Sequence, residues 1–325
     1  MSAIPSPTPY TWRPLRYEDL PALHTLLLAV SGSEDRVDTL ADMQGGFEDP
    51  WSDAAVDSIV AFAADGQMAA YGRCSLHPEP EREAVVHLDY EIHPAHWTPA
   101  VHDRLLDWLE ARGRTRLEAA PAGLPHSIRT GVSDDKVAEI DLLECHGFTP
   151  IRYFFRMRRA LHQPIAERPL PAGVRLQCYT PDDGETMRIV FNEAFKDHWG
   201  HEEVLREDWE KWFVGSDTFR SDLSLLAFAG DNAVGITFCT VNPDDNARSG
   251  RHECNIREVA VLRPWRKQGI ASALISESLR LMRAAGLDYA SLGVDTANPT
   301  SALGVYEKLG FVPVRRFVVY DKKVV

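Results

Sequence analysis

The sequence predicts an α/β protein with a mixed sheet, built twice along one chain. Three observations indicate this fold. Short apolar runs that resemble strands alternate with amphipathic helical segments, one ending pattern occurs in both halves, and a proline-rich stretch separates the halves. With 325 residues, the chain is long enough for two domains of about 150 residues each.

The repeated pattern lies at the end of each half. The first half closes on ECHGFTPIRYFFRM (144–157) and the second on EKLGFVPVRRFVVY (307–320). Glycine often ends a helix because it tolerates the left-handed conformation. Each pattern therefore predicts a helix that ends near Gly147 or Gly310, followed by a strand. We interpret the chain as a duplicated domain.

A proline-rich stretch at 161–173, LHQPIAERPLPAG, divides the repeats. Proline restricts its own backbone and that of the preceding residue, so this stretch reads as an irregular linker. We therefore expect a first domain at 1–160, a linker at 161–173 and a second domain at 174–325.

The second half predicts its elements in a regular order. Its predicted strands lie at 174–178, 223–229, 233–241, 254–262, 289–294 and 312–320, and its predicted helices at 182–195, 207–214, 270–285 and 300–309. On helix 270–285, five apolar residues recur at near-helical spacing: Ala271, Leu274, Ile275, Leu279 and Met282. This spacing predicts one buried face.

Composition and charge narrow the class of partner. The formal net charge is −13, with the acidic excess in the first half, which disfavours nucleic acid and favours a small cation such as an amine. The five cysteines form no C-x-x-C pair, and HEEVL (201–205) lacks the second histidine of a zinc motif, so no metal is expected. No apolar run is long enough to span a bilayer, so we expect no membrane association. The start of the chain does not resemble a signal peptide, and we expect a cytoplasmic protein. A homodimer remains open.

The segment IREVAVLRPWRKQGIAS (256–272) is the strongest candidate for a binding site. An apolar strand leads into a basic turn that reads R-x-x-G-x-A, and a long helix follows. Helix N-termini expose unpaired N–H groups, and small residues let a phosphate approach the backbone. The pattern predicts a diphosphate site, and the alternative is an ordinary turn with surface charges. Neither G-x-x-x-x-G-K-[ST] nor G-x-G-x-x-G is present, which disfavours a nucleoside triphosphate or a dinucleotide.

This segment, together with NPTSALGVYEKLGF (298–311), resembles the two signatures of the GNAT acetyltransferase superfamily. The tandem arrangement with a degenerate first copy is similar to that of mycothiol synthase and its relatives. The resemblance implies an acyl-CoA-dependent N-acetyltransferase that moves an acetyl group from acetyl-CoA to the amine of a small molecule by direct attack. The alternative is a non-catalytic acyl-CoA-binding or regulatory module.

The resemblance also implies roles for single residues. Tyr306 would be the general acid that protonates the departing thiolate. Val259, Ala260 and Val261 would pair with the pantetheine arm where two parallel strands separate. The remaining predicted cofactor-binding residues are Arg266, Lys267, Gln268, Gly269, Ile270, Ala271, Ser272 and Asn298.

The general base and the acceptor site are less defined. Glu258 is the first candidate base, with Asp295 and a chain of water molecules as alternatives, and a structural ion pair with a neighbouring arginine is an equal reading of Glu258. Asp197, His198 and Trp199 lie where the family shapes its acceptor site. They predict amine recognition by a carboxylate and an aromatic wall. The alternative there is a polar loop with a buried tryptophan.

The first half lacks the same features. At the position of the R-x-x-G-x-A turn it has Trp97, Ala100 and His102 with Pro99 between them, and Leu143 stands where the second half has Tyr306. Proline also removes a donor N–H. We expect this copy to bind no diphosphate and to act as a scaffold. A row of polar residues (His87, Asp89, Glu91 and His93) is expected to form the solvated face of its strand rather than a metal site.

Overall fold

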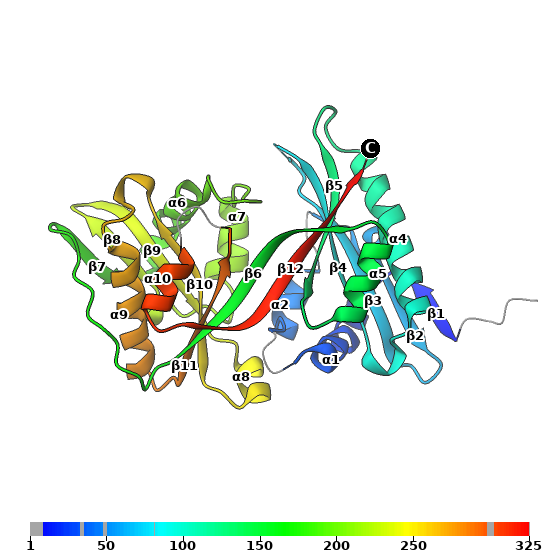
Figure 1. The fold of residues 1–325 in the computed structure, drawn as a ribbon, viewed down its shortest axis with the longest axis horizontal. Helices are drawn as coiled ribbons and strands as arrows, with labels where there is room; N and C mark the ends of the chain where they lie inside the picture. The colour runs from blue at the N-terminus through cyan, green and yellow to red at the C-terminus, as the bar shows by residue number, and fades with distance from the viewer. Residues whose placement is uncertain (1–8, 33–35, 48–50, 81, 298–301, 325) are drawn as a thin grey trace, which may run out of the picture. The chain divides into compact units, whose positions relative to one another are not determined.

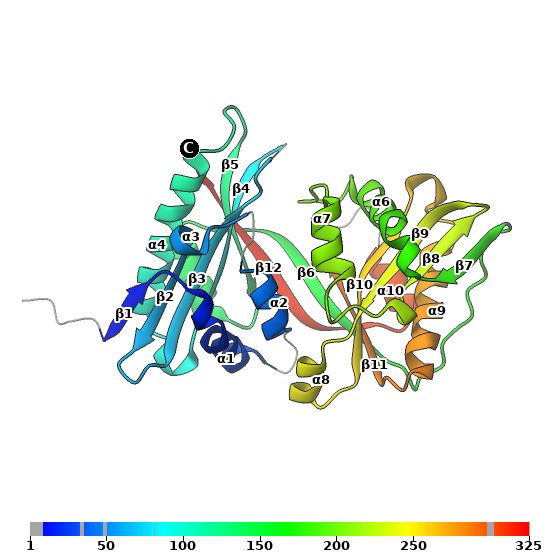
Figure 2. The same ribbon diagram turned by 180° about the vertical axis from the view of Figure 1, so that it is seen from behind.

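A computed structural model describes residues 9–32, 36–47, 51–80, 82–297 and 302–324. The chain folds into two compact units. Unit 1 is Met1–Arg152 with Phe317–Val325, and unit 2 is Tyr153–Arg316. Both units have the expected α/β character, with sheets of mixed direction covered by helices (Figures 1 and 2).

Unit 1 contains a sheet with the strand order β1-β2-β3-β4-β5-β12. Strands β4 and β5 run parallel, whereas the other neighbours are antiparallel. Helix α1 packs on one face through a cluster that includes Leu23, Leu26 and Val60. Its elements are β1 (Tyr10–Arg13), α1 (Leu20–Val30), α2 (Leu40–Gly45), α3 (Ala54–Asp57), β2 (Ser58–Ala63), β3 (Met68–Leu76), β4 (Ala84–Ile92), α4 (Pro99–Glu118), β5 (His126–Ser133) and α5 (Val137–Cys145).

Unit 2 repeats this plan with the strand order β6-β11-β10-β9-β8-β7. Strands β10 and β11 run parallel, and their other neighbours are antiparallel. The elements from β6 to the end of the chain are β6 (Thr149–Ala160), β7 (Val174–Cys178), α6 (Gly184–Phe195), α7 (Arg206–Trp209), a π-helical turn (Glu210–Val214), β8 (Leu225–Ala229), β9 (Asn232–Thr240), α8 (Pro243–Ser249), β10 (Glu253–Val261), α9 (Ile270–Ala284), β11 (Tyr289–Asp295), α10 (Ala302–Lys308) and β12 (Val312–Val324).

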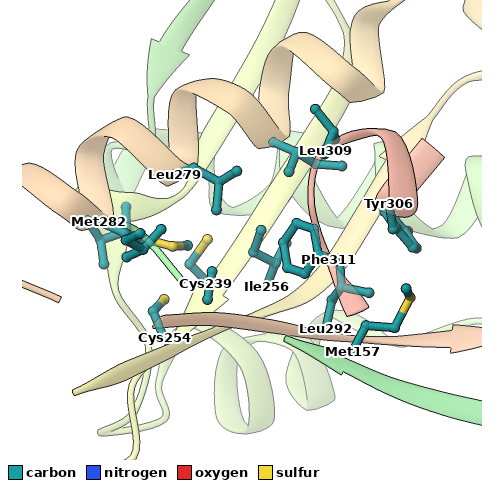
Figure 3. Packing of buried hydrophobic residues seen from close by; sticks show 14 of the residues in the cluster. Met157, Cys239, Cys254, Ile256, Leu279, Met282, Leu292, Tyr306, Leu309 and Phe311 are labelled. Carbon is teal, nitrogen blue, oxygen red and sulfur yellow. The ribbon is translucent and has the colours of Figure 1, made fainter. Parts of the chain in front are cut away.

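Helices pack against both faces of the sheet of unit 2 and form a hydrophobic layer on each face. Helices α9 and α10 cover one face, where Leu279, Met282 and Leu309 pack with Phe311 (Figure 3). Helices α6 and α7 cover the other face through an aromatic cluster around Trp209. The buried face predicted for α9 is confirmed at Leu274, Ile275, Leu279 and Met282, whereas Ala271 is half-buried.

The boundaries of the compact units differ from those expected from the sequence. Phe154–Ala160 of β6 pair with β11 inside unit 2, although they end the first repeat. Phe317–Val324 of β12 pair with β5 inside unit 1, although they end the second repeat. The compact units and the predicted domains therefore divide the chain at different positions. Each repeat contributes its last strand to the sheet of the other unit, and the irregular stretch 161–173 lies within unit 2.

Smaller differences concern element lengths. Helix α8 was not predicted. It forms because Asn242 caps its first turn by accepting from the amides of Asp244 and Asp245. Strand β12 continues four residues beyond the predicted end at 320, to Val324, since its second half pairs with β5. Both predicted helix-ending glycines, Gly147 and Gly310, have positive φ angles of 82° and 86°.

Candidate active site

Strands β10 and β11 separate at their carboxyl ends. Their parallel pairing runs from Glu253 with Tyr289 to Ile256 with Leu292. Beyond this point β10 continues to Val261 against β9, and β11 continues to Asp295 against β6. The register between β10 and β9 shifts between Ile256 and Glu258, which is a β-bulge, and bulges bend the strand that carries them. The two strands thus part toward their carboxyl ends, and we call this place the opening.

Main-chain groups of β10 face this opening. The amide of Leu262 donates to the carbonyl of Val234 on β9 at 2.9 Å. Residues along an antiparallel strand direct their N–H and C=O groups alternately to either side. The groups of Val259 and Val261 therefore point away from β9, toward the opening, whereas those of Ala260 point to β9.

The turn after β10 has two residues in the left-handed region. Lys267 has φ 62° and Gly269 has φ 88°. A non-glycine residue in this region is uncommon and often marks a functional turn. A methyl group on Gly269 would contact only the carbonyl oxygen of Pro169, at 3.7 Å, so the space above this glycine is open. Lys267, Gln268 and Gly269 are all exposed.

The N-terminus of α9 follows directly. The amide of Ala273 donates to the carbonyl of Gly269 at 3.0 Å, which is the first bond of the helix. The amides of Ile270, Ala271 and Ser272 precede this bond and therefore have no acceptor within the helix. The residues predicted to bind the diphosphate thus combine an exposed turn with N–H groups that have no acceptor within α9.

Arg266 and Asp197 both form contacts within the basic loop and its surroundings. The Arg266 guanidinium donates to the carbonyls of Val261 (3.0 Å) and Ala194 (2.7 Å), which ties the loop to β10 and α6. Asp197 forms an ion pair with Arg263 and lies 3.4 Å from the Nη1 atom of Arg266. Its hydrogen bond with Arg263 holds the pKa of Asp197 below its usual range. This carboxylate is therefore engaged by the basic loop.

Trp199 and His198 pack against aromatic rings. The ring of Trp199 lies 6.4 Å from that of Phe154, and His198 lies 4.9 Å from Phe195. Phe154 pairs with Asp295, the last residue of β11, so Trp199 lies at the same end of the sheet as the opening. Phe154 was missed in the sequence because it ends the first repeat, whereas the site is built from the second.

Tyr306 extends from α10 into the core, beside Phe311 at a ring distance of 6.2 Å (Figure 3). Burial raises the pKa of the Tyr306 hydroxyl above its usual range, and the negative charge of Glu258 raises it further. Glu258 is the first residue of β10 after the bulge, and its side chain is about one fifth exposed (20%). The charge of Glu258, on β10, thus acts on the hydroxyl of Tyr306, on α10.

The remaining candidates are only partly described. Asp295, the alternative base, is buried at the end of β11, and its Oδ1 atom accepts from the amide of Ala297 at 2.9 Å. Asn298 lies outside the described residues. Among the residues that the structure does describe, no cluster of three or more His, Cys, Asp or Glu side chains could hold a metal ion. Within the same residues, no helix is long and apolar enough to cross a membrane.

In unit 1 the corresponding parallel strands also part, but the helix that follows the first of them has a capped N-terminus. Its parallel strands β4 and β5 also stop pairing early, at His87 and Arg129. The N-terminus of α4 is capped by Thr98, which accepts from the amide of Val101 at 3.3 Å. Leu143, at the position of Tyr306, is fully buried and brings no ionisable group.

Comparisons with known proteins define the class of this fold. Residues 185–311 match the family model described as "Acetyltransferase (GNAT) family", and this segment contains the separated strands, the basic turn and α10. Unit 2 therefore carries a GNAT acetyltransferase domain.

Curated relatives extend the likeness across both repeats. A mycothiol acetyltransferase of Thermobispora bispora is 33% identical over 201 residues, which is 60% of this chain and 65%, just under two thirds, of that protein. A mycothiol acetyltransferase of Salinispora arenicola is 27% identical over 280 residues, 83% of this chain and 82% of that protein. The matched family model and the names of these relatives both belong to the acetyltransferases.

Solved structures show the same fold over the whole chain. A GCN5-related N-acetyltransferase from Sphaerobacter thermophilus has a TM-score of 0.73 at 24% identity, covering 98% of this chain and 96% of that one. A tandem GNAT protein from the clavulanic acid biosynthesis pathway has a TM-score of 0.68 at 18% identity, covering 97% and 98%. The predicted tandem GNAT-like fold is thereby confirmed.

Proposed function

We propose that unit 2 transfers an acetyl group from acetyl-CoA directly to the amine of a small molecule. The observation that supports this proposal is the end of the parallel pairing of β10 and β11 beside the exposed turn before α9, together with the influence of the Glu258 charge on the pKa of Tyr306. A binding module needs the first two features, whereas proton transfer needs the third.

The residues of the opening fit acetyl-CoA. The amides from Lys267 to Ser272 would hold its diphosphate, because donors and the positive end of a helix dipole favour an anion. The N–H and C=O groups of Val259 and the N–H of Val261 would bind the amide-containing arm. Arg266 would act through the loop that it braces. The bound cofactor supplies an acetyl thioester that an amine can attack.

Two side chains would move the protons of this reaction. The amine must lose a proton as its bond to the acetyl carbon forms, and Glu258, partly exposed next to the opening, is the proposed acceptor of that proton. The carbon–sulfur bond breaks at the same carbon, and the sulfur takes a proton. Tyr306 is the proposed donor of that proton, since its raised pKa leaves the hydroxyl protonated at neutral pH, as in an ordinary tyrosine.

The acceptor amine would lie against an aromatic wall formed by Trp199 and Phe154. Asp197 is paired with Arg263 and Arg266, so we propose that this carboxylate acts on the basic loop and that the aromatic wall receives the amine. The names of the curated relatives make the precursor of mycothiol the first acceptor to test. Unit 1, with its capped helix and Leu143, would be a scaffold that performs no chemistry.

The experiment measures thiol release from acetyl-CoA with a panel of amines, and cofactor affinity by calorimetry. Tyr306→Phe is expected to lower kcat by about 10²-fold or more while affinity changes little. Tyr289→Phe, on the same unit at the far end of β11, is the matched control and is expected to keep full activity. A chain that binds acetyl-CoA but turns over no amine would instead be a binding module. Full activity of Tyr306→Phe would show that the acid is another group.

A further inference from the structure

Arg159 is a buried arginine of β6 with unusual partners. Its residue is 4% exposed. Its Nε atom donates to the carbonyl of Leu309 at 2.6 Å, Nη2 donates to Pro164 at 2.7 Å, and Nη1 donates to Ala160 at 3.2 Å. A guanidinium has five N–H donors, so these three bonds leave two donors unused.

The positive charge of Arg159 forms no ion pair with any Asp or Glu among the described residues. The cationic Arg283 of α9 acts on it and, together with burial, lowers the pKa of Arg159. The buried Arg129 of unit 1 provides a contrast, since it pairs with both Asp321 and Glu83. An arginine stays charged in proteins, and a buried charge without a counter-charge is strongly unfavourable.

A cavity of about 250 Å³ lies against Arg159. Its walls combine apolar side chains, including Ile165, Leu279 and Leu309, with the polar residues Gln163 and Lys308. Lys308 is exposed, and neither it nor Arg283 forms an ion pair with a described residue. Two cations, Arg159 and Lys308, thus line one small cavity in a chain of net charge −13, and the charge of Arg283 acts on Arg159.

We propose that this cavity binds a small organic oxyanion, a carboxylate or phosphate group carried on a short apolar body. The oxyanion would accept the two unused donors of Arg159 and supply the missing counter-charge, and the apolar body would contact Ile165, Leu279 and Leu309. Arg283 and Lys308 would attract it from the surface.

This site is separate from the candidate active site. Arg159 pairs with Ala290 near the start of β11, whereas the opening lies at the other end of that strand, at Asp295. The five-residue interval corresponds to about 16 Å along a strand. The proposal does not depend on the acetyltransferase chemistry, and its test uses no catalytic readout.

The experiment uses the full chain at low ionic strength and follows two signals. Calorimetry measures binding of butyrate, of inorganic phosphate and of a short-chain alkyl phosphate, with chloride as the reference anion. Nuclear magnetic resonance follows the Arg159 Nε–H signal, assigned by its loss in Arg159→Met. We expect saturable binding that shifts this signal. Tighter binding of butyrate would identify a carboxylate site, and tighter binding of the phosphates a phosphate site.

Two exposed positions keep the proposal testable if Arg159→Met does not fold. Lys308→Glu and Arg283→Glu are each expected to raise the dissociation constant about tenfold, because each replaces an attractive charge by a repulsive one. Arg175→Glu, on β7 of the same unit, is the matched control and should bind as the unchanged chain does. Absence of saturable binding of all three anions, or equal affinity in Lys308→Glu, Arg283→Glu and the unchanged chain, would overturn the proposal.

Discussion

Arg266 donates a hydrogen bond from Nε to the carbonyl oxygen of Val261, the last residue of β10, at 3.0 Å. A second bond, from Nη2 to Ala194, fixes the end of α6 to the same guanidinium. The arginine of the R-x-x-G-x-A turn therefore supports the backbone of the site through hydrogen bonds to main-chain carbonyls. It holds the strand end and the N-terminus of α9 in one arrangement.

Arg266→Met is expected to weaken acetyl-CoA binding about tenfold, since hydrogen bonds from a charged group contribute roughly 1.5–3 kcal/mol. Arg263→Met removes a neighbouring arginine whose side chain is 72% exposed and paired with Asp197, and it should change affinity less than about twofold. Calorimetric titration of both variants checks the difference. A larger loss in Arg263→Met would mean that the exposed arginine contacts the cofactor itself.

Gly269→Glu is expected to abolish acetyl-CoA binding, because it places bulk and negative charge over the open space at the start of α9. Gly269→Ala adds no charge, so it should still bind acetyl-CoA. Its φ of 88° should cost about 1 kcal/mol of stability in this variant. Gly286→Glu, at φ 80° after α9 and also in open space, is the control for the backbone cost. The measurements are cofactor titration and thermal melting. Retained binding in Gly269→Glu would move the diphosphate elsewhere.

Much of unit 2 could be predicted from sequence because its signals are local. The turn at 263–269 and the helix after it are contiguous, and Gly310 adopts the left-handed backbone that its position indicated. The ion pair between Asp197 and Arg263 could not be predicted, because it joins residues 66 positions apart. The burial of Arg159 without an ion pair to a described residue could not be predicted either, because it depends on where the chain after β6 folds back.

The sequence also could not predict which sheet the last strand of each repeat joins. ECHGFTPIRYFFRM and EKLGFVPVRRFVVY have the same pattern of helix end, glycine and strand, so each fits the edge of either sheet equally well. Long-range contacts decide the outcome, such as Arg129 on β5 with Asp321 on β12. Local pattern describes what a segment becomes, whereas pairing depends on these distant partners.

Asp321→Asn is expected to destabilise unit 1 by about 3–5 kcal/mol, because it leaves Arg129 buried with only part of its counter-charge. Asp222→Asn breaks an exposed pair with Arg220 and should cost less than about 1 kcal/mol. Urea unfolding of both variants provides the comparison. Equal stability of the two would show that Glu83 alone compensates Arg129.

His102 predicts a pH dependence of stability in unit 1. Burial lowers its pKa to about 4, from a usual value near 6.5, and the ring is 1% exposed beside Tyr90. The folded state therefore favours neutral His102. Its contribution is complete above about pH 6.5 and is lost as the pH falls from there toward 4, by up to about 3 kcal/mol.

His102→Gln should remove this dependence. The stability difference between the unchanged chain and this variant is expected to shrink as the pH falls from 7 to 4, measured by denaturant unfolding at several pH values. His252→Gln, whose side chain is 73% exposed, should leave the profile as it is. A constant difference across the range would mean that His102 protonates at its ordinary pKa in the folded protein.

The placement of the last strands restricts how this chain can be divided. A fragment cut between the repeats would keep β6 without the neighbour β11, and its remainder would keep β12 without β5. Each fragment would contain one strand without its native neighbour and one sheet edge without its native strand, so the native pairing of both strands requires both fragments. Neither repeat can therefore be deleted without removing a native strand from the sheet of the other unit, even if only one repeat performs chemistry.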